Sequence, residues 1–312
     1  MRIKHPDEGM EKICRVYNVT RQAFYSMFSA QQKESLAFAI VLVLVKEIRC
    51  EIPGIGTRKL LLMLLPEFKK HGIKLGRDQL FDLLRVQGLL IRRRKRIAKT
   101  TDSFHWLHKH PNLIQNLILT RPEELWVSDI TYLRTCVGFS YLSLITDAYS
   151  RKIVGYALYP TLEAIGCLAA LKMAEHGRQY KHLDLPLIHH SDRGIQYCSD
   201  NYVTMLQLAG ISISMTQTGS PYDNALAERV NETIKVDYFP IRIYDNHAAA
   251  SVAVDKIIQS YNGKRPHQSI GYLTPQQAHH TTTPLKKLWK KYPRHRKGTE
   301  AHLGIQTQNK SM

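Results

Sequence analysis

HHSDRGIQY, residues 189–197, marks the point where an apolar run passes into a polar turn. The run before it is typical of a buried strand, and the Gly-containing turn ends that strand at Asp192. SPYDNALAERVNETIK, residues 220–235, begins in a loop with Ser and Pro and continues with the period of a helix. One face of this helix carries Asn224, Glu228, Asn231 and Lys235. An apolar stripe beside that face predicts that the helix packs on a sheet and presents an acid, two amides and a lysine to a groove.

A third carboxylate lies within ELWVSDITYL, residues 124–133, whose alternation is typical of a strand. Trp126 points to one side of this strand and Asp129 to the other, where an uncompensated charge is costly. Sixty-two residues separate Asp129 from Asp192, and thirty-five separate Asp192 from Glu228. A single acid is usually a solvated or salt-bridged carboxylate, but three acids in three distinct motifs indicate a shared site.

Four pieces of the chain together resemble the DDE transposases of bacterial insertion sequences, in the group whose catalytic domain is related to retroviral integrases. The matching pieces are WVSDITYL (126–133), HHSDRGIQY (189–197), SPYDNALAERVNETIK (220–235) and YNGKRPHQSIGYLTPQQ (261–277). Lys235 stands seven residues after Glu228, and the interval of thirty-five residues before Glu228 is the usual one in that family. The likeness extends over residues 52–277, which is most of the chain.

The resemblance implies that Asp129, Asp192 and Glu228 are catalytic residues and metal ligands, with Asp129 bridging. The implied reaction is metal-dependent cleavage of a DNA 3′ end followed by strand transfer. Carboxylate oxygens suit Mg²⁺ or Mn²⁺, and two such ions about 4 Å apart serve both the attacking and the leaving oxygen. Water attacks first and a DNA 3′-hydroxyl next, so that no Ser, Tyr or Cys nucleophile is required.

Further residues are candidates for contact with DNA. Lys235 is placed to hold a phosphate near the scissile bond, although apart from the resemblance it is an ordinary surface lysine. Tyr222 and Asn224 precede the helix and are candidates for contact with the DNA end, unless Asn224 only caps the helix. A basic run, read as a phosphate-binding arm or else as a solvated charged segment, begins with Arg92, Arg93, Arg94, Lys95 and Arg96.

Two groups of charged residues have alternative interpretations. Asp147 is the main competitor for a catalytic acid, but its position in a turn beside a basic dipeptide favours a turn or salt-bridge role. Lys264, Arg265 and His267 either touch DNA or merely cap the domain.

Composition limits the class of partner. The formal net charge of +18 and the sequence pI of about 9.7 indicate a polyanion, with nucleic acid ahead of an anionic membrane. The longest apolar run, Leu36 to Val45, is half the length of a spanning helix, and no signal peptide opens the chain. We therefore expect a cytoplasmic protein with no membrane partner, and the resemblance implies that it is bacterial and nucleoid-associated. The five cysteines lack CxxC spacing and indicate neither zinc nor disulfides.

Five segments are expected along the chain. They are an N-terminal helical segment (1–30), a helix-turn-helix DNA-binding region with its basic arm (31–98), a linker (99–120), an integrase-like catalytic core (121–280) and a basic disordered tail (281–312). The first contains two short helices over residues 9–28, the second capped by Thr20. Gln31 to Arg49 is apolar all round in its middle and rich in Val and Ile, which would also suit a strand, but the polar residues on both sides favour a helix. We expect a dimer or an interdomain contact to cover this helix. Thr57 to His71 and Arg77 to Gln87 form either a helix-turn-helix or ordinary core packing.

The expected fold class is α/β. The order of elements from residue 125 onward is three strands, a helix, a strand, a helix, a strand and the helix of Glu228. This order predicts a ribonuclease-H-like fold, in which a five-stranded mixed sheet begins with an antiparallel meander and ends with helical crossovers. A further helix is expected over Ala248 to Tyr261.

The implied partners are double-stranded DNA, both insertion-sequence ends and target, and further copies of the chain assembled on that DNA. Many members of the family are made as a fusion with an upstream frame, whose product is a possible partner. Two rival functions stay open: a DNA-binding regulator with an inert catalytic domain, and a ribonuclease-H-type nuclease.

Overall fold

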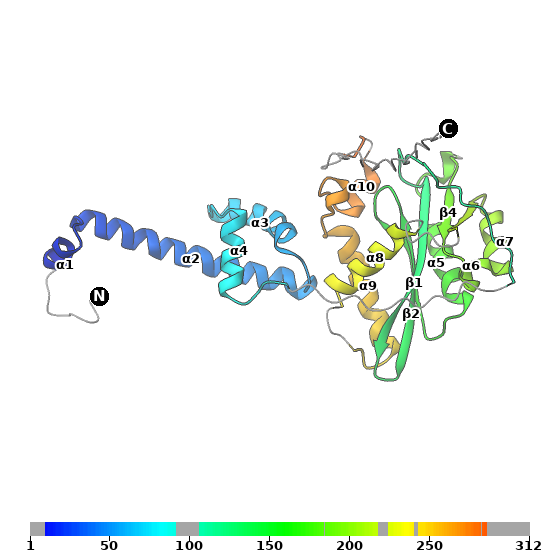
Figure 1. Cartoon of the computed structure of the whole chain (residues 1–312), viewed down its shortest axis with the longest axis horizontal. Helices are drawn as coiled ribbons and strands as arrows, with labels where there is room; N and C mark the ends of the chain where they lie inside the picture. Colours follow the sequence, from blue (N-terminus) through cyan, green and yellow to red (C-terminus); the bar gives the residue numbers. More distant parts are fainter. Residues whose placement is uncertain are drawn as a thin grey trace, which may run out of the picture.

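The structure is a computed structural model that describes residues 10–91, 106–183, 185–217, 224–239, 243–281 and 283–285. Tyr222, the basic residues from Arg92 to Arg96 and nearly all of the expected tail lie outside these ranges. The described residues form an α/β body and a helical arm that extends from it (Figure 1).

Four helices make up the N-terminal part: α1 (Met10–Val16), α2 (Arg21–Glu51), α3 (Thr57–His71) and α4 (Arg77–Val86). The bounds predicted for α3 are confirmed, and α4 ends one residue earlier than expected. Thr20 caps α2 as predicted, because its Oγ1 accepts a hydrogen bond from Ala23 N at 3.1 Å. The expected separate helix ending near Phe28 is wrong. No Gly or Pro interrupts α2, which therefore continues through the expected boundary between residues 30 and 31.

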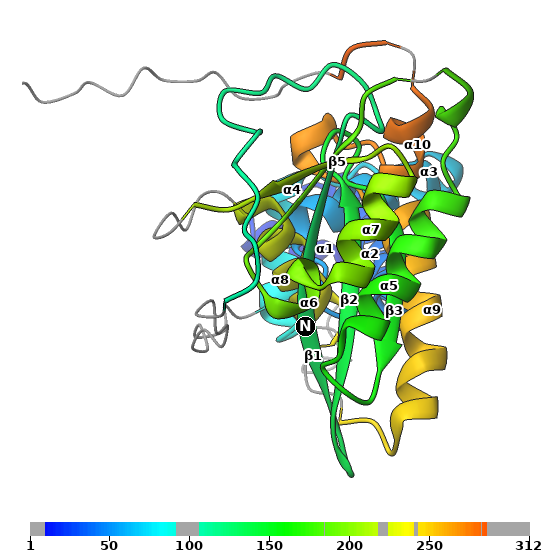
Figure 2. The same cartoon turned by 90° about the vertical axis from the view of Figure 1, so that its right-hand side faces the viewer.

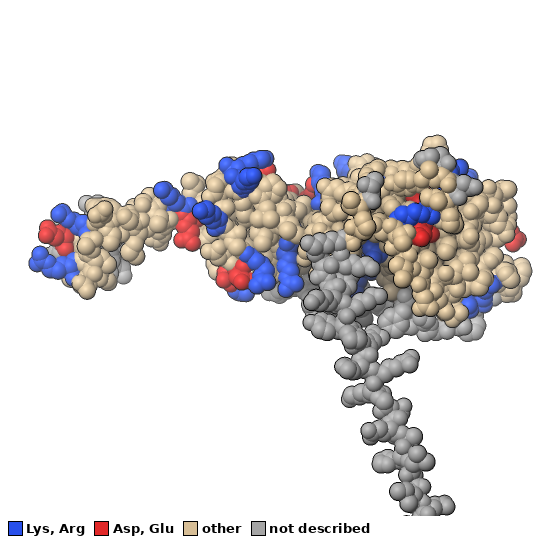
Figure 3. Space-filling model, turned by 90° about the horizontal axis from the view of Figure 1, so that it is seen from above, with Lys and Arg blue, Asp and Glu red and all other residues tan. Residues whose placement is uncertain are grey.

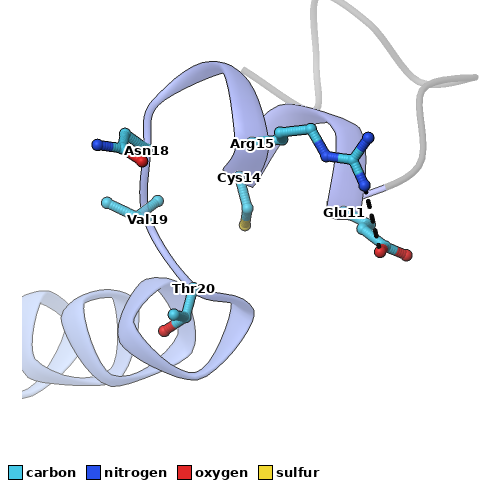
Figure 4. A pocket seen from close by; sticks show the side chains of 6 residues that line it. All are labelled: Glu11, Cys14, Arg15, Asn18, Val19 and Thr20. Carbon is cyan, nitrogen blue, oxygen red and sulfur yellow. Dashed lines mark ion pairs between the residues drawn. The ribbon is translucent and has the colours of Figure 1, made fainter.

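The turn between α1 and α2 encloses a small open hollow (Figure 4). It is lined by Glu11, Cys14, Arg15, Asn18, Val19 and Thr20. The backbone of Asn18 has φ 51°, a left-handed conformation that Asn tolerates better than most residues. Glu11 and Arg15 form an exposed ion pair at 4.0 Å. The hollow follows from the tight turn and gathers no set of reactive groups.

The sheet has five strands in the order β3-β2-β1-β4-β5. They are β1 (Leu125–Thr135), β2 (Gly138–Asp147), β3 (Ile153–Tyr159), β4 (Ile188–Ser191) and β5 (Ser212–Met215). β1, β2 and β3 pair antiparallel, whereas β1 with β4 and β4 with β5 pair parallel. The predicted mixed five-stranded sheet of the ribonuclease-H-like fold is therefore confirmed.

Helices cover both faces of this sheet (Figures 1 and 2). They are α5 (Ala164–His176), α6 (Ile195–Cys198), α7 (Asp200–Leu208), α8 (Ala225–Asp237), α9 (His247–Gly263) and α10 (Pro275–His280). The predicted alternation of β1 holds: Trp126 and Ile130 pack in the cluster with α5 and α7, and Leu133 packs in the cluster with α8 and α9. Gly155 lets α5 approach β3 closely, because a Cβ there would lie 2.2 Å from Ala170 O.

Part of the expected linker is fastened to the sheet. Met215 N donates to Pro111 O at 3.2 Å, and Leu113 N donates to Ser214 Oγ at 2.9 Å. Ile114 also packs against the small cluster around Leu125. This stretch therefore runs along β5 at the edge of the sheet and protects part of that edge.

Two elements that were not predicted, α10 and the 3₁₀ turn Lys181–Leu183, lie near a buried charged cluster at the end of β2. Asp147 accepts hydrogen bonds from Ser150 N at 2.7 Å and from Glu123 N at 2.7 Å. His279 of α10 lies 3.8 Å from Asp147 and 3.7 Å from Glu123. Asp147 is thus a turn and ion-pair residue, as its sequence context favoured, and it holds α10 against the sheet.

The helical arm and the α/β body share one hydrophobic cluster. It runs from Leu60 and Leu80 of the arm, through Ile52 and Ile55, to Ile234 of α8. A unit joined by a continuous core resists relative motion more than one joined by a solvated linker.

Gly54, in the turn between α2 and α3, brings the arm into backbone contact with α8. Its N–H donates to Asp237 O at 2.8 Å. A Cβ on Gly54 would lie 2.2 Å from Val236 O, which no rotamer change relieves. Beside this contact, Lys264 Nζ and Glu51 Oε2 form an ion pair at 2.9 Å.

We predict that Gly54→Ala separates the arm from α8 and lowers the free energy of unfolding by about 1–3 kcal/mol, as overpacking does elsewhere. Chemical denaturation of the full chain measures this change. Gly263→Ala is the matched control, because its Cβ would meet nothing within 4 Å and the residue is helical. Equal stability of the two variants would show that the close approach at Gly54 carries no energy.

Candidate active site

Asp129 and Asp192 lie on neighbouring parallel strands. β1 pairs with β4 in the register Trp126 to His189 and Val127 to His190. Continuing this register by two residues brings Asp129 level with Asp192, which directly follows β4. Since adjacent strands lie about 4.8 Å apart, the two carboxylates share one region of the sheet. The sixty-two intervening residues form the meander and the crossover helix that this pairing requires.

α8 is held against β1 by two amide side chains. Asn231 Nδ2 donates to Asp129 Oδ2 at 2.8 Å, and Asn224 Nδ2 donates to the Ser128 carbonyl at 3.1 Å. Both asparagines are 6% exposed. Glu228 lies between them on the same face of α8, and its side chain is exposed. The two hydrogen bonds therefore hold against β1 the face of α8 that also carries Glu228.

The carboxyl group of Asp129 is destabilised in its charged form. Burial and the nearby charge of Asp192 raise its pKa, Asn231 and Ile130 N lower it by hydrogen bonding, and Glu228 raises it further. The net result is a pKa of about 7. Two like charges near a half-buried carboxylate disfavour its ionisation unless a cation joins them. Burial and the two other acids therefore outweigh the groups that stabilise the charged form of Asp129.

Lys235 of α8 lies over the ring of Tyr132 of β1. Its Nζ is 4.2 Å from the centre of the Tyr132 ring, an arrangement that stabilises the ammonium group by a cation–π interaction. Burial lowers the pKa of Lys235, and the charge of Asp129 opposes this effect. The lysine predicted to bind phosphate is therefore half-buried beside the acids.

A layer of neutral polar groups supports the site from the opposite face of the sheet. The Ser128 and Tyr202 hydroxyls lie 2.6 and 2.9 Å from His189 Nε2. Burial, with the neighbouring His190, lowers the pKa of His189 to about 3, so its ring is neutral. A neutral ring adds no positive charge beneath the acids, and the raised pKa of Asp129 is left uncompensated from this side.

Several expected site residues are not brought into the site. Tyr222 and the residues from Arg92 to Arg96 lie outside the described part of the chain. Among the described residues, no three His, Cys, Asp or Glu side chains lie close enough to hold one metal ion as they stand. Asp129 and Asp192 are half-buried, and Glu228 is the exposed one of the three acids.

The sequence interpretation missed two functional features of this region. Asn231 was placed on the face of Glu228 but was given no role, although its spacing of three residues from Glu228 carried the signal. Arg265 was left as a DNA contact or a cap. It is 4% exposed, and its Nη2 lies 2.6 Å from Asp237 Oδ2 at the end of α8. Arg265 therefore caps and anchors α8, and the DNA-contact alternative is wrong for this residue.

Comparisons with known proteins identify relatives of this chain. Residues 120–221 match one family described as an integrase core domain, and residues 209–275 match a second family of the same description. A transposase for insertion sequence element IS629 from Shigella sonnei is 32% identical, covering 72% of this chain and 73% of that protein. An uncharacterized 31 kDa protein of insertion element IS600 from Shigella sonnei is also 32% identical, covering 84% of this chain and 96% of that protein. Among solved structures, the chain is similar to the HTLV-2 integrase catalytic core domain, with a TM-score of 0.40 and 19% identity over 51% of this chain and 98% of that one.

The raised pKa of Asp129 generates a prediction for the metal-free protein. Between pH 4 and pH 7 the unfolded chain loses the Asp129 proton while the folded chain keeps it, so this group makes stability fall as the pH rises. Asp129→Asn removes that effect, because an amide does not ionise. The melting temperature of the variant relative to the unsubstituted protein should therefore be higher at pH 8 than at pH 5.

Asp200→Asn, at an exposed position at the start of α7, is the matched control, and its effect should be the same at both pH values. If Asp129→Asn changes the melting temperature equally at pH 5 and pH 8, the other acids do not oppose ionisation of the Asp129 carboxyl group.

Proposed function

The chain belongs to the insertion-sequence transposases with an integrase core, and we propose that Asp129, Asp192 and Glu228 are the catalytic acids of its polynucleotidyl transfer. The enzyme acts in DNA transposition. In the proposed reaction, a water oxygen attacks the phosphodiester at an insertion-sequence end and releases a 3′-hydroxyl. That hydroxyl then attacks a phosphodiester of the target DNA in the same site.

The observation that carries this proposal is the convergence on Asp129. Asp192 is level with it across the β1–β4 pair, and α8 is tied to it by the Asn231 hydrogen bond. Both other acids contribute to the raised pKa of Asp129, which requires that their charges lie nearby. Three carboxylates from distant parts of the chain are an arrangement that costs stability, and such clusters are typical of functional sites.

The donor set fits hard divalent cations, Mg²⁺ or Mn²⁺. All three proposed donors are carboxylates, whose hard oxygen atoms suit these ions. Asp129 and Asp192 would hold the ions, and Glu228, whose side chain is exposed, would join them by a change of rotamer. Two such ions, when bound, polarise the scissile phosphate and acidify the attacking water.

Other residues would position the DNA. Lys235 is half-buried beside Asp129, where an ammonium group meets a phosphate that approaches the acids. Asn224 has a buried Oδ1 with no hydrogen-bond partner among the described residues, at the N-terminal end of α8. We assign Tyr222 and Asn224 to the DNA end, and the run from Arg92 to Arg96 to phosphates outside the catalytic site.

The N-terminal helical arm supplies the remaining basic surface. Figure 3 shows Lys and Arg side chains gathered over α2, α3 and α4, while the visible face of the body carries few charges. The exposed basic residues of α3, α4 and the loop between them include Arg58, Lys69, Lys70, Lys74, Arg77 and Arg85. In the proposed arrangement α3 and α4 form a helix-turn-helix that binds double-stranded DNA, with α4 entering the major groove.

Copies of the chain would assemble on paired DNA ends in the bacterial cytoplasm, at the nucleoid. The product of an upstream frame is a further proposed partner, which would contribute recognition of the terminal repeats.

Strand nicking and joining on an end-bearing duplex test the proposed acids. With Mg²⁺, the full chain should release a 3′-hydroxyl and join it to a second duplex. Asp192→Asn and Glu228→Gln should each reduce both products at least about a hundredfold while leaving DNA binding intact. Binding without cleavage would identify a regulator, and cleavage without joining would identify a nuclease.

Metal binding has a separate readout that needs no DNA. Mg²⁺ or Mn²⁺ at millimolar concentration should raise the melting temperature, because the cation relieves repulsion among the three acids. The shift should be smaller in Asp192→Asn than in Asp200→Asn. The absence of any shift in the unsubstituted protein would count against the assignment of ligands.

A further inference from the structure

α2 has apolar side chains on two opposite faces. One face is covered: Val41 and Val45 are fully buried, and Ile48 packs against the same cluster of α3 and α4. Part of the apolar surface of α2 is therefore covered within the chain, by α3 and α4. The sequence had left two covers open, a dimer or an interdomain contact.

The other face of α2 is uncovered in the described structure. Tyr25, Phe28, Leu36 and Val43 are 56%, 51%, 64% and 55% exposed. At 100° per residue these four side chains fall within about 80° of one another, and they form a stripe about 27 Å long. Isolated exposed apolar residues are common, but four of them aligned along one helix, interrupted by Gln32, mark an interaction surface. We call these four residues the outer stripe.

A lipid bilayer does not fit the outer stripe. By length and composition alone α2 is apolar enough to cross a membrane. Its C-terminal half, however, is committed to the core of the arm through Val41 and Val45, and Lys33 and Glu34 interrupt its middle. A spanning helix would have to withdraw Val41 and Val45 from that core and bury two charges in hydrocarbon.

The outer stripe is complementary to itself in the antiparallel direction. If two α2 helices pair about a two-fold axis near residue 34, Tyr25 meets Val43 of the other copy, and Phe28 meets the small, exposed Ala39 and the adjoining Ile40. Large side chains then face smaller ones, whereas parallel pairing would set aromatic rings against each other. The stripe runs on the side of α2 opposite to α3 and α4, so neither arm obstructs the other.

The charged residues at the ends of the outer stripe also favour antiparallel pairing. Arg21 and Glu47 lie at the two ends of the outer stripe, and both are exposed. Neither forms an ion pair within the described part of the chain. In the antiparallel pair Arg21 of one copy lies opposite Glu47 of the other at both ends, and in a parallel pair like charges would meet.

We propose that the occupant of the outer stripe is a second copy of this chain, paired antiparallel through α2. The contact places the two α3–α4 regions on opposite outer sides of the pair, at its two ends. This inference deepens the proposed assembly on DNA ends and rests on it for its role in transposition, but the contact itself forms without DNA or metal.

Sedimentation of the full chain without DNA tests the contact and its direction. The unsubstituted protein should show a concentration-dependent dimer. Arg21→Glu and Glu47→Arg should each raise the dissociation constant about tenfold, and the double variant should restore the original value. Leu36→Glu should raise it at least about a hundredfold, because each copy then buries a charge. Leu208→Glu, at an 85% exposed site on α7, is the matched control and should have no effect.

Three results would overturn the inference: a monomer at every concentration, a dimer that Leu36→Glu leaves intact, or single charge variants that the double variant does not rescue. Binding of the unsubstituted chain to anionic vesicles with loss of the dimer would also overturn it in favour of a membrane. A chain that nicks and joins DNA yet fails these tests contradicts only the α2 contact, since the catalytic assay is independent of it.

Discussion

The parallel pairing of β1 with β4 is the constraint on which the catalytic region depends. It sets Asp129 beside Asp192 although sixty-two residues separate them, and it does so with main-chain hydrogen bonds that do not depend on the side chains. A shift of one residue would turn Asp129 to the opposite face, away from α8. The alternating burial of β1, with Trp126 on one side and Leu133 on the other, makes that shift costly.

α8 connects this pair of acids to the rest of the molecule. Near its start and middle, Asn224 and Asn231 tie it to β1. At its end, Asp237 accepts hydrogen bonds from Gly54 N at 2.8 Å and from Arg265 Nε at 2.7 Å. The helix that carries Glu228 is therefore held by the sheet and by the arm at the same time. Because the arm also carries the exposed basic helices, the surface proposed to bind DNA and the helix of Glu228 belong to one packed unit.

Asp147 and Asp129, two acids of the same sheet, have different neighbours, and their pKa values shift in opposite directions. Burial alone would raise the pKa of Asp147, but hydrogen bonding and the charge of His279, with hydrogen bonds from Ser150, lower it overall. Asp129 has amide donors but no cation that outweighs Asp192 and Glu228, and its pKa rises to about 7. The surroundings of Asp147 stabilise its charged form, and those of Asp129 do not. The difference supports a structural role for Asp147 and the proposed catalytic role for Asp129.

The elements of the body could be predicted from the sequence because the periods of strands and helices are properties of consecutive residues. The bounds of α3, the order of the strands and the three acids all follow from such local patterns and from the motifs that carry the family likeness. Local patterns did not predict three other features: the continuity of α2, the hydrogen bond from Asn231 to Asp129 and the burial of Arg265 against Asp237. Each depends on which distant segment the fold brings alongside, and the same lysines, arginines and asparagines would be ordinary surface residues in another topology. The sequence by itself therefore determined the class of the fold and singled out the candidate acids, whereas the tertiary structure alone decided their partners, since burial and pairing arise only when separate segments meet.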